Sequence, residues 1–107
     1  MSDVKTVDIT VADLNFQVIE VPLGDKTWFI RINWNEYGQF FTMDINDYSD
    51  TVVVRGIRLI ANTILAPDYI TTTNMPQGVF YVVSQRDEAV LRNDFIDGIA
   101  ILRYYFV

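Results

Sequence analysis

The chain has 107 residues and a net charge of −6, and it contains neither cysteine nor histidine. The negative charge and the scattered arginines oppose binding to nucleic acid or to anionic membranes, which require clustered Lys and Arg. The missing cysteine and histidine exclude disulfide frameworks, thiolate nucleophiles, Ser-His hydrolases and most zinc sites. The length predicts a single domain over residues 1–107, because two smaller pieces could not each bury a core.

The beginning of the chain contains two segments with the alternation of β-strands. Residues 1–13 are predicted as a terminal arm or edge strand, because β-branched and polar side chains alternate within the segment 4–11. The next segment is a stronger strand candidate, in which one face carries Leu14, Phe16 and Val18. A Pro-Leu-Gly-Asp turn then leads into the following strand.

The segment from Thr27 to Asp47 predicts a β-hairpin. One face of its first arm carries Trp28, Ile30, Ile32 and Trp34. The same face of its second arm carries Phe41, Met43 and Ile45. The four residues that start at Asn35 form the predicted turn, since Asn and Gly favour such positions. Together with the preceding strand, this hairpin predicts an antiparallel meander of three strands.

Residues 51–60 follow an acidic turn and predict a short strand that bends at Gly56. Residues 61–78 contain two prolines and a polar Thr-Thr-Thr-Asn run. This segment predicts a long connection with room for one short helical turn, and connections of this length are often interaction loops or flexible ones.

The last third of the chain predicts two further strands around a charged segment. Residues 79–84 are apolar at nearly every position, which indicates a strand buried on both faces, as a sandwich or interface strand would be. Residues 85–98 are strongly charged and predict a short helix or an ordered loop, and residues 99–107 predict a closing aromatic strand. The predicted fold is therefore all-β: a small antiparallel sandwich or partly closed barrel built on a meander, with at most one short helix.

Carboxylates are the groups left for catalysis or metal binding. One set is spaced by three along a strand end and turn: Asp44, Asp47 and Asp50. It lacks the glycine and the distal glutamate of a helical calcium loop, so a solvated turn is predicted, with a cation site as the alternative. A second set predicts surface ion pairs with Arg86 and Arg92: Asp87, Glu88, Asp94 and Asp97. A domain of this size offers little room for a catalytic cleft, so we expect no enzyme, no cofactor and no bound metal.

Aromatic side chains are the better candidates for function. The predicted interaction surface comprises Trp28, Trp34, Tyr37, Phe40, Tyr69, Tyr104, Tyr105 and Phe106. Core packing is the alternative for Trp28 and Trp34, because both follow the strand period toward one face. The closing strand is also a candidate contact, since so apolar an end is rarely left in water.

The sequence from Phe16 onward resembles the baseplate plug proteins of contractile-tailed bacteriophages, in particular a small cyanophage type. The most specific stretches are Trp34-Asn35 before a turn, Phe40-Phe41-Thr42-Met43-Asp44-Ile45 after it, and then Gly56-Ile57-Arg58-Leu59. The later parts that fit are Pro76-Gln77-Gly78-Val79, Asp94-Phe95 and a final strand with Arg103 and Tyr105.

This resemblance implies a structural virion component at the central hub of the baseplate, which helps close the tail tube through protein contacts. The expected partners are other baseplate proteins and tail-tube or hub proteins, with the chain as a homo-oligomer or part of a symmetric ring. The alternative is a stand-alone binding module that recognises a peptide or glycan through the aromatic hairpin.

The expected location is the tail baseplate of the virion, after synthesis in the host cytoplasm. The first residues lack the basic patch and apolar run of a secretory signal. No segment has the ~18 consecutive apolar residues of a membrane-spanning helix.

Overall fold

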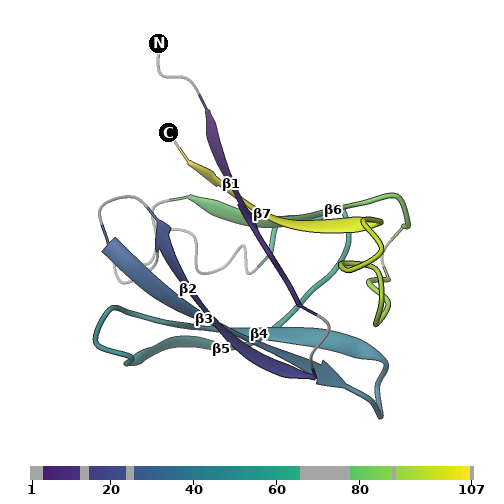
Figure 1. Cartoon of the computed structure of the whole chain (residues 1–107), viewed down its shortest axis with the longest axis horizontal. Coiled ribbons are helices and arrows are strands. Elements are labelled where there is room, and N and C mark those ends of the chain that lie inside the picture. Colours follow the sequence, from purple (N-terminus) through teal and green to yellow (C-terminus); the bar gives the residue numbers. More distant parts are fainter. Residues whose placement is uncertain (1–3, 13–14, 24–25, 66–77, 88, 107) are drawn as a thin grey trace.

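A computed structural model describes residues 4–12, 15–23, 26–65, 78–87 and 89–106 of the chain. Two antiparallel sheets face each other as a sandwich (Figure 1), so the all-β prediction is confirmed and the barrel alternative is not adopted. The strands are β1 (Lys5–Ile9), β2 (Phe16–Leu23), β3 (Lys26–Asn35), β4 (Phe40–Asn46), β5 (Val52–Arg58), β6 (Val79–Ser84) and β7 (Ala100–Phe106). The described residues form no helix, and hence none that is long and apolar enough to cross a membrane.

The larger sheet has the strand order β2-β3-β4-β5, which confirms the predicted meander. In the hairpin of β3 and β4, Ile32 lies opposite Met43 and Trp34 lies opposite Phe41. The predicted turn lies between these strands, and the amide N–H of Gly38 donates to Oδ1 of Asn35 over 2.9 Å. Alternation alone was enough to predict this hairpin and its buried side, because only one of its faces is apolar enough to be buried.

Strand β2 buries the face opposite to its Phe16 and Val18 side chains. These two side chains are exposed, whereas Gln17 and Val21 point into the sandwich. Both faces of β2 carry apolar residues, so its alternation did not determine which face turns inward. Leu14, the third residue of the predicted face, lies outside the described residues.

A side-chain amide closes the corner between β1 and β2. Nε2 of Gln17 donates to the carbonyl oxygen of Ala12 over 3.0 Å, and Oε1 of Gln17 accepts the Ala12 N–H over 2.9 Å. The buried amide thus makes the same pair of bonds that a neighbouring strand would make. This satisfies backbone groups where the chain passes from one sheet to the other.

Strand β5 bends at Gly56, as predicted. Gly56 has a φ of 72°, in the region that glycine occupies without strain. Its N–H donates to Oδ1 of Asp44 on β4 over 2.8 Å, beside a register shift between the two strands. The bend is therefore a β-bulge anchored by a carboxylate.

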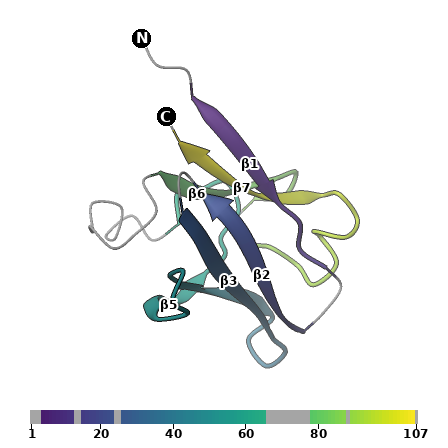
Figure 2. The same cartoon turned by 60° about the vertical axis from the view of Figure 1, so that its left-hand side comes forward.

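The smaller sheet has the strand order β1-β7-β6 (Figure 2). Strand β7 lies in the middle and pairs with β1 from Lys5 opposite Phe106 to Ile9 opposite Leu102. Strand β1 is thus an edge strand whose partner lies at the far end of the sequence. The alternation of the sequence predicted that β1 is a strand but did not indicate that it pairs with β7.

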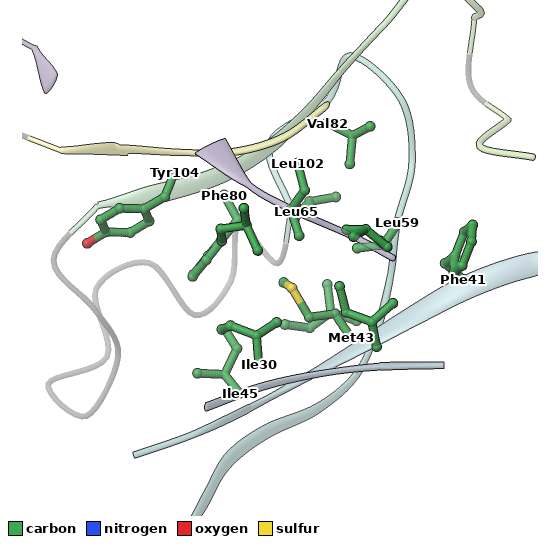
Figure 3. Close-up of a cluster of buried hydrophobic side chains, with 14 of the residues drawn as sticks. Ile30, Phe41, Met43, Ile45, Leu59, Leu65, Phe80, Val82, Leu102 and Tyr104 are labelled. Atoms are coloured by element: carbon green, nitrogen blue, oxygen red, sulfur yellow. The ribbon is translucent and has the colours of Figure 1, made fainter. Parts of the chain in front are cut away.

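The two sheets enclose one hydrophobic core. Figure 3 shows side chains of the larger sheet, including Ile30, Met43 and Ile45, facing Phe80 and Leu102 of the smaller sheet. Leu59 and Leu65, from the segment that leaves the larger sheet, pack in the same cluster. Burying each large apolar side chain stabilises the fold by about 1.5–3 kcal/mol, and this burial holds the two layers together.

The free edge of β6 is covered by the chain that follows β5. Ala61 and Ile64 form single bridges with Val82 and Tyr81, and the N–H of Leu65 donates to the carbonyl of Phe80 over 2.9 Å. The rest of the predicted long connection, residues 66–77, lies outside the described residues. In the described part of the chain, the backbone of this segment therefore shields the outer edge of β6, as commonly happens at sandwich edges.

Strand β6 is buried on one face only. Phe80 and Val82 lie in the core, whereas Val79, Tyr81 and Val83 are half-buried on the outer side. The prediction of burial on both faces was therefore wrong for the isolated chain. A fully apolar strand at this position leaves apolar side chains on the outer face of the sandwich.

Candidate interaction surface

Three of the predicted surface aromatics lie in the core. The exposed fractions of Trp28, Trp34 and Tyr104 are 6%, 8% and 1%. Nε1 of Trp34 donates to Oε2 of Glu36 over 2.6 Å, and its ring meets Phe41 edge-on with the centroids 4.7 Å apart. All three rings are placed for packing, and for Trp28 and Trp34 this is the core packing given as the alternative.

Burial also controls the chemistry of Tyr104. Desolvation of its phenol raises the pKa to about 12, because the low-dielectric surroundings disfavour the phenolate. The ring packs against Phe80 at 5.0 Å and stacks on Phe106 at 5.5 Å between centroids. Phe106 therefore continues the core toward the end of β7, where it is half-buried.

The β3–β4 turn presents two of the other predicted aromatics. Tyr37 is fully exposed at its tip. Phe40 is half-buried, and the guanidinium of Arg58 lies 4.4 Å from the centre of its ring, within the range of a cation–π contact. Tyr69 lies outside the described residues. The hairpin thus offers one free ring rather than an aromatic platform.

The outer side of the smaller sheet is apolar. We call this surface the apolar outer face, and its residues are Thr6, Asp8, Val79, Tyr81, Val83, Ile101, Arg103 and Tyr105. The register places Val79 opposite Tyr105, Tyr81 opposite Arg103, and Val83 opposite Ile101, so the face is continuous across the strands. The rings of Tyr81 and Tyr105 meet edge-on with their centroids 6.2 Å apart.

Sequence reasoning named Tyr105 of this face and the closing strand as a candidate contact, but none of the side chains of β1 or β6. The signal for the side chains of β6 was its unbroken apolar run, which predicted burial on both faces in a sandwich or at an interface. Cross-strand neighbours stand about 5 Å apart, so the side chains shield one another and remain half-buried without any second layer. A sandwich normally turns polar residues outward, which makes this surface a candidate contact.

An ion pair lies within the apolar outer face. Nε of Arg103 lies 2.6 Å from Oδ1 of Asp8, and Nη2 lies 3.4 Å from Oδ2. The hydrogen bond from Arg103 lowers the pKa of Asp8, and Asp8 in turn raises the pKa of Arg103. The pair joins β1 to β7 and leaves the described part of this face without net charge.

The outer side of the larger sheet is polar along β3 and β4. Asn33 on β3 lies opposite Thr42 on β4, and Arg31 lies opposite Asp44. Nη2 of Arg31 also lies 3.4 Å from Asp50 in the turn that follows β4. The outer side of the larger sheet therefore combines polar side chains on β3 and β4 with two exposed apolar side chains on β2, Phe16 and Val18.

The acidic turn uses its carboxylates for its own backbone. Oδ1 of Asp47 accepts the N–H groups of Ser49 and Thr51, at 2.9 and 3.0 Å. Asp50 accepts a bond from Nδ2 of Asn46, and this bond, together with Arg31, lowers the pKa of Asp50. Within the described residues, no three acidic, His or Cys side chains are placed to hold a metal ion.

The loop between β6 and β7 is built on a buried carboxylate. Asp94 is 2% exposed, and Nε of Arg86 lies 3.1 Å from both of its carboxylate oxygens. The N–H of Leu91 also donates to Asp94, over 2.9 Å. The predicted ion pair between Asp94 and Arg86 is present, but Asp94 is buried rather than at the surface, because the loop folds over it in successive turns.

A comparison with models of known protein families matches residues 4–106 to the family described as cyanophage baseplate Pam3 plug gp18. The chain belongs to this family. Membership of the baseplate plug family confirms the resemblance found in the sequence, and it indicates a structural role in a phage tail baseplate. The match covers β1 to β7, including the whole apolar outer face.

The plug family also indicates association with other baseplate proteins and a location in the virion tail. A role of this kind is structural rather than enzymatic. A search of curated proteins finds none that matches the chain.

Proposed function

We propose that this chain is a plug or hub-associated subunit of a phage baseplate that helps close the end of the tail tube through protein contacts. The observation that carries the proposal is the family match over residues 4–106. The chain is made in the host cytoplasm and assembles there into the baseplate, as a homo-oligomer or part of a symmetric ring.

The fold supplies what a subunit acting by contact needs. Its core is closed between two sheets, so the outer surfaces are free for neighbours. The apolar outer face and the exposed ring of Tyr37 are the surfaces we assign to contact, together with the half-buried Tyr105 and Phe106 of β7. Tyr69 belongs to the proposed surface by its sequence alone.

The stand-alone binding module is the weaker proposal. Its aromatic hairpin would have to offer several rings to a peptide or glycan. Trp28 and Trp34 are buried in the core, so within the hairpin only Tyr37 is fully available.

Quantitative mass spectrometry of phage particles, and of baseplates detached from them, tests the proposal. We expect a small fixed copy number that follows the baseplate fraction. Absence from particles, with the chain abundant in infected cells, would contradict the proposed role and lead to ligand screens on the hairpin.

A further inference from the structure

We propose that copies of this chain join head to tail, with β5 of one copy paired to β2 of the next, so that their larger sheets form one closed ring. The inference names the contact within the symmetric ring proposed above and rests on that proposal. Strands β2 and β5 are the two edges of the larger sheet, so every copy has one edge of each kind to offer.

The even number of strands in the larger sheet suits such a ring. Strands β2 and β4 run in one direction and β3 and β5 in the other, because each neighbouring pair is antiparallel. A copy related by rotation about an axis roughly along the strands keeps these directions, so its β2 meets β5 antiparallel. The alternation of strand directions thus continues from copy to copy without a break.

The free edge of β2 presents backbone donors and acceptors. The N–H of Trp34 donates to the carbonyl of Asn15 over 2.8 Å, so this pair and every second pair after it are hydrogen-bonded between β3 and β2. Phe16, Val18 and Glu20 therefore direct their N–H and C=O groups away from β3, and no hydrogen bond from another described residue reaches them. A strand edge of this kind is a template for a further strand.

The last part of β5 and the residues after it present the matching groups. The N–H of Leu59 donates to the carbonyl of Phe41 over 3.0 Å, so the backbone groups of Leu59 face β4. Its neighbours Arg58 and Ile60 therefore direct their own backbone groups to the free edge. Both of their side chains are exposed on the outer side of the sheet, as are those of the β2 edge.

The charges on the two edges are opposite. Glu20 is the only charged residue of β2, and Arg55 and Arg58 are the only charged residues of β5. A contact between two β2 strands offers only acids, and a contact between two β5 strands offers only bases, whereas the head-to-tail contact can place Glu20 opposite Arg58. In the described part of the chain Arg58 lies against the ring of Phe40 and forms no ion pair with a carboxylate.

The register that pairs these two charges also pairs exposed apolar side chains. With Glu20 opposite Arg58, antiparallel pairing places Val18, 47% exposed, opposite Ile60, 38% exposed. Phe16 then becomes a diagonal neighbour of Ile60 on the same outer side. The charge contact and the apolar contact thus lie side by side in one ladder, and each of the two directly opposed pairs forms two backbone hydrogen bonds.

The same register ends where neither strand has a donor to leave unpaired. Pro22, the next residue of the β2 edge, has no N–H. It would lie opposite Gly56, whose N–H already donates to Oδ1 of Asp44 over 2.8 Å. Neither residue therefore brings an unsatisfied N–H into the contact.

One such contact is small. Two opposed pairs with four hydrogen bonds bury less than the roughly 1,200 Å² in total that separates weak from stable interfaces. We therefore expect free chains to associate at about 0.1–1 mM. Closure of the ring strengthens the assembly, because its last contact forms within one particle.

Cysteine cross-linking of the full chain tests the inference, since the natural chain has no cysteine. In a Val18→Cys/Ile60→Cys chain the two thiols of one copy are three strand spacings apart, about 14 Å, which is too far for a disulfide. Oxidation at about 1 mM should therefore give a ladder of multimers that ends in a closed ring without free thiols. Val18→Cys/Ile101→Cys is the matched control, because Ile101 is 36% exposed on the smaller sheet, and it should cross-link at least about tenfold less.

Charge reversal tests the pairing of the two edges. In sedimentation equilibrium, Glu20→Arg and Arg58→Glu should each weaken association about fivefold or more, and the chain with both changes should recover it. Arg55→Glu makes the same change of net charge on the other side of the bulge, so it should leave association nearly unchanged. Far-UV circular dichroism checks the fold of each variant, and Glu20→Cys/Arg58→Cys replaces the first cross-link if that chain does not fold.

Several results would overturn the inference. These are cross-linked products that stop at dimers, grow into open polymers or match the control, an Arg55→Glu chain that dissociates as readily as Arg58→Glu, and a double reversal that does not recover association. A chain that is present in baseplates but gives no ring of cross-links would contradict this inference alone. A cross-linked ring from a chain that is absent from virions would contradict the plug role instead.

Discussion

Replacing Asp94 with alanine removes the carboxylate around which the loop between β6 and β7 is folded. Its bond from the N–H of Leu91 is charge-assisted, and such bonds contribute about 1.5–3 kcal/mol. The Arg86 side chain is 45% exposed, so solvent screens that pair to about 0.5–1 kcal/mol. We expect Asp94→Ala to lower the free energy of unfolding by about 2–4 kcal/mol.

Urea denaturation followed by tryptophan fluorescence measures this loss. With an m-value of about 1.5 kcal/mol/M, a loss of 3 kcal/mol would lower the midpoint by about 2 M. Asp97→Ala is the control, because Asp97 is exposed in the same loop, and its effect should stay within about 0.5 kcal/mol. A loss below about 0.5 kcal/mol for Asp94→Ala, or equal losses for both variants, would refute the structural role of the carboxylate.

Three further predictions concern the sheets. Gly78→Ala should lower the free energy of unfolding in urea by more than about 2 kcal/mol, because the added Cβ would collide with a backbone carbonyl of β7. Gly56→Ala should lower it by about 1 kcal/mol, because the site has space for a Cβ but its φ of 72° strains a residue other than glycine. The reverse order would contradict the packing at Gly78. Asp8, with its pKa lowered chiefly by Arg103, contributes stability that is present above pH 3.8 and lost as the pH falls through the folded-state pKa. The pH dependence of unfolding should therefore be weaker in Asp8→Asn, and identical profiles below pH 4 would count against the ion pair. Absorbance titration at alkaline pH should show the Tyr104 phenol ionising near pH 12, and the stability that this phenol contributes is full below pH 10 and lost as the pH rises through 12. A Tyr104→Phe chain that keeps the late phase would assign it to another residue.

The sequence predicted the larger sheet well because the information there is local. In β3 and β4 one face is apolar and the other polar, so alternation determined both the strands and their buried side. In β2 both faces carry apolar residues, and the pattern placed Phe16 and Val18 together without showing that they face outward. An apolar face on each side of a strand leaves the choice to the tertiary fold.

The candidate surface was predicted less well, since it depends on contacts distant in sequence. Asp8 and Arg103 are 95 residues apart, and nothing in either segment indicates the other. The burial of Asp94 was hidden for a similar reason, because a charged loop usually denotes a solvated surface. The tryptophans were the most conspicuous candidates in the sequence, and the structure uses both as core.

The placement of β7 between β1 and β6 determines the order in which the chain can fold during synthesis. The β2-β3-β4-β5 sheet pairs only strands that are neighbours in sequence, so it can form as soon as β5 has left the ribosome. Strand β1 is made first but pairs with a strand made more than 90 residues later, a delay of about 5–20 s at bacterial rates of synthesis. Over that interval the inner surface of the finished sheet is not yet covered by the smaller sheet. This is the period in which the newly made chain most needs a chaperone or rapid release from the ribosome.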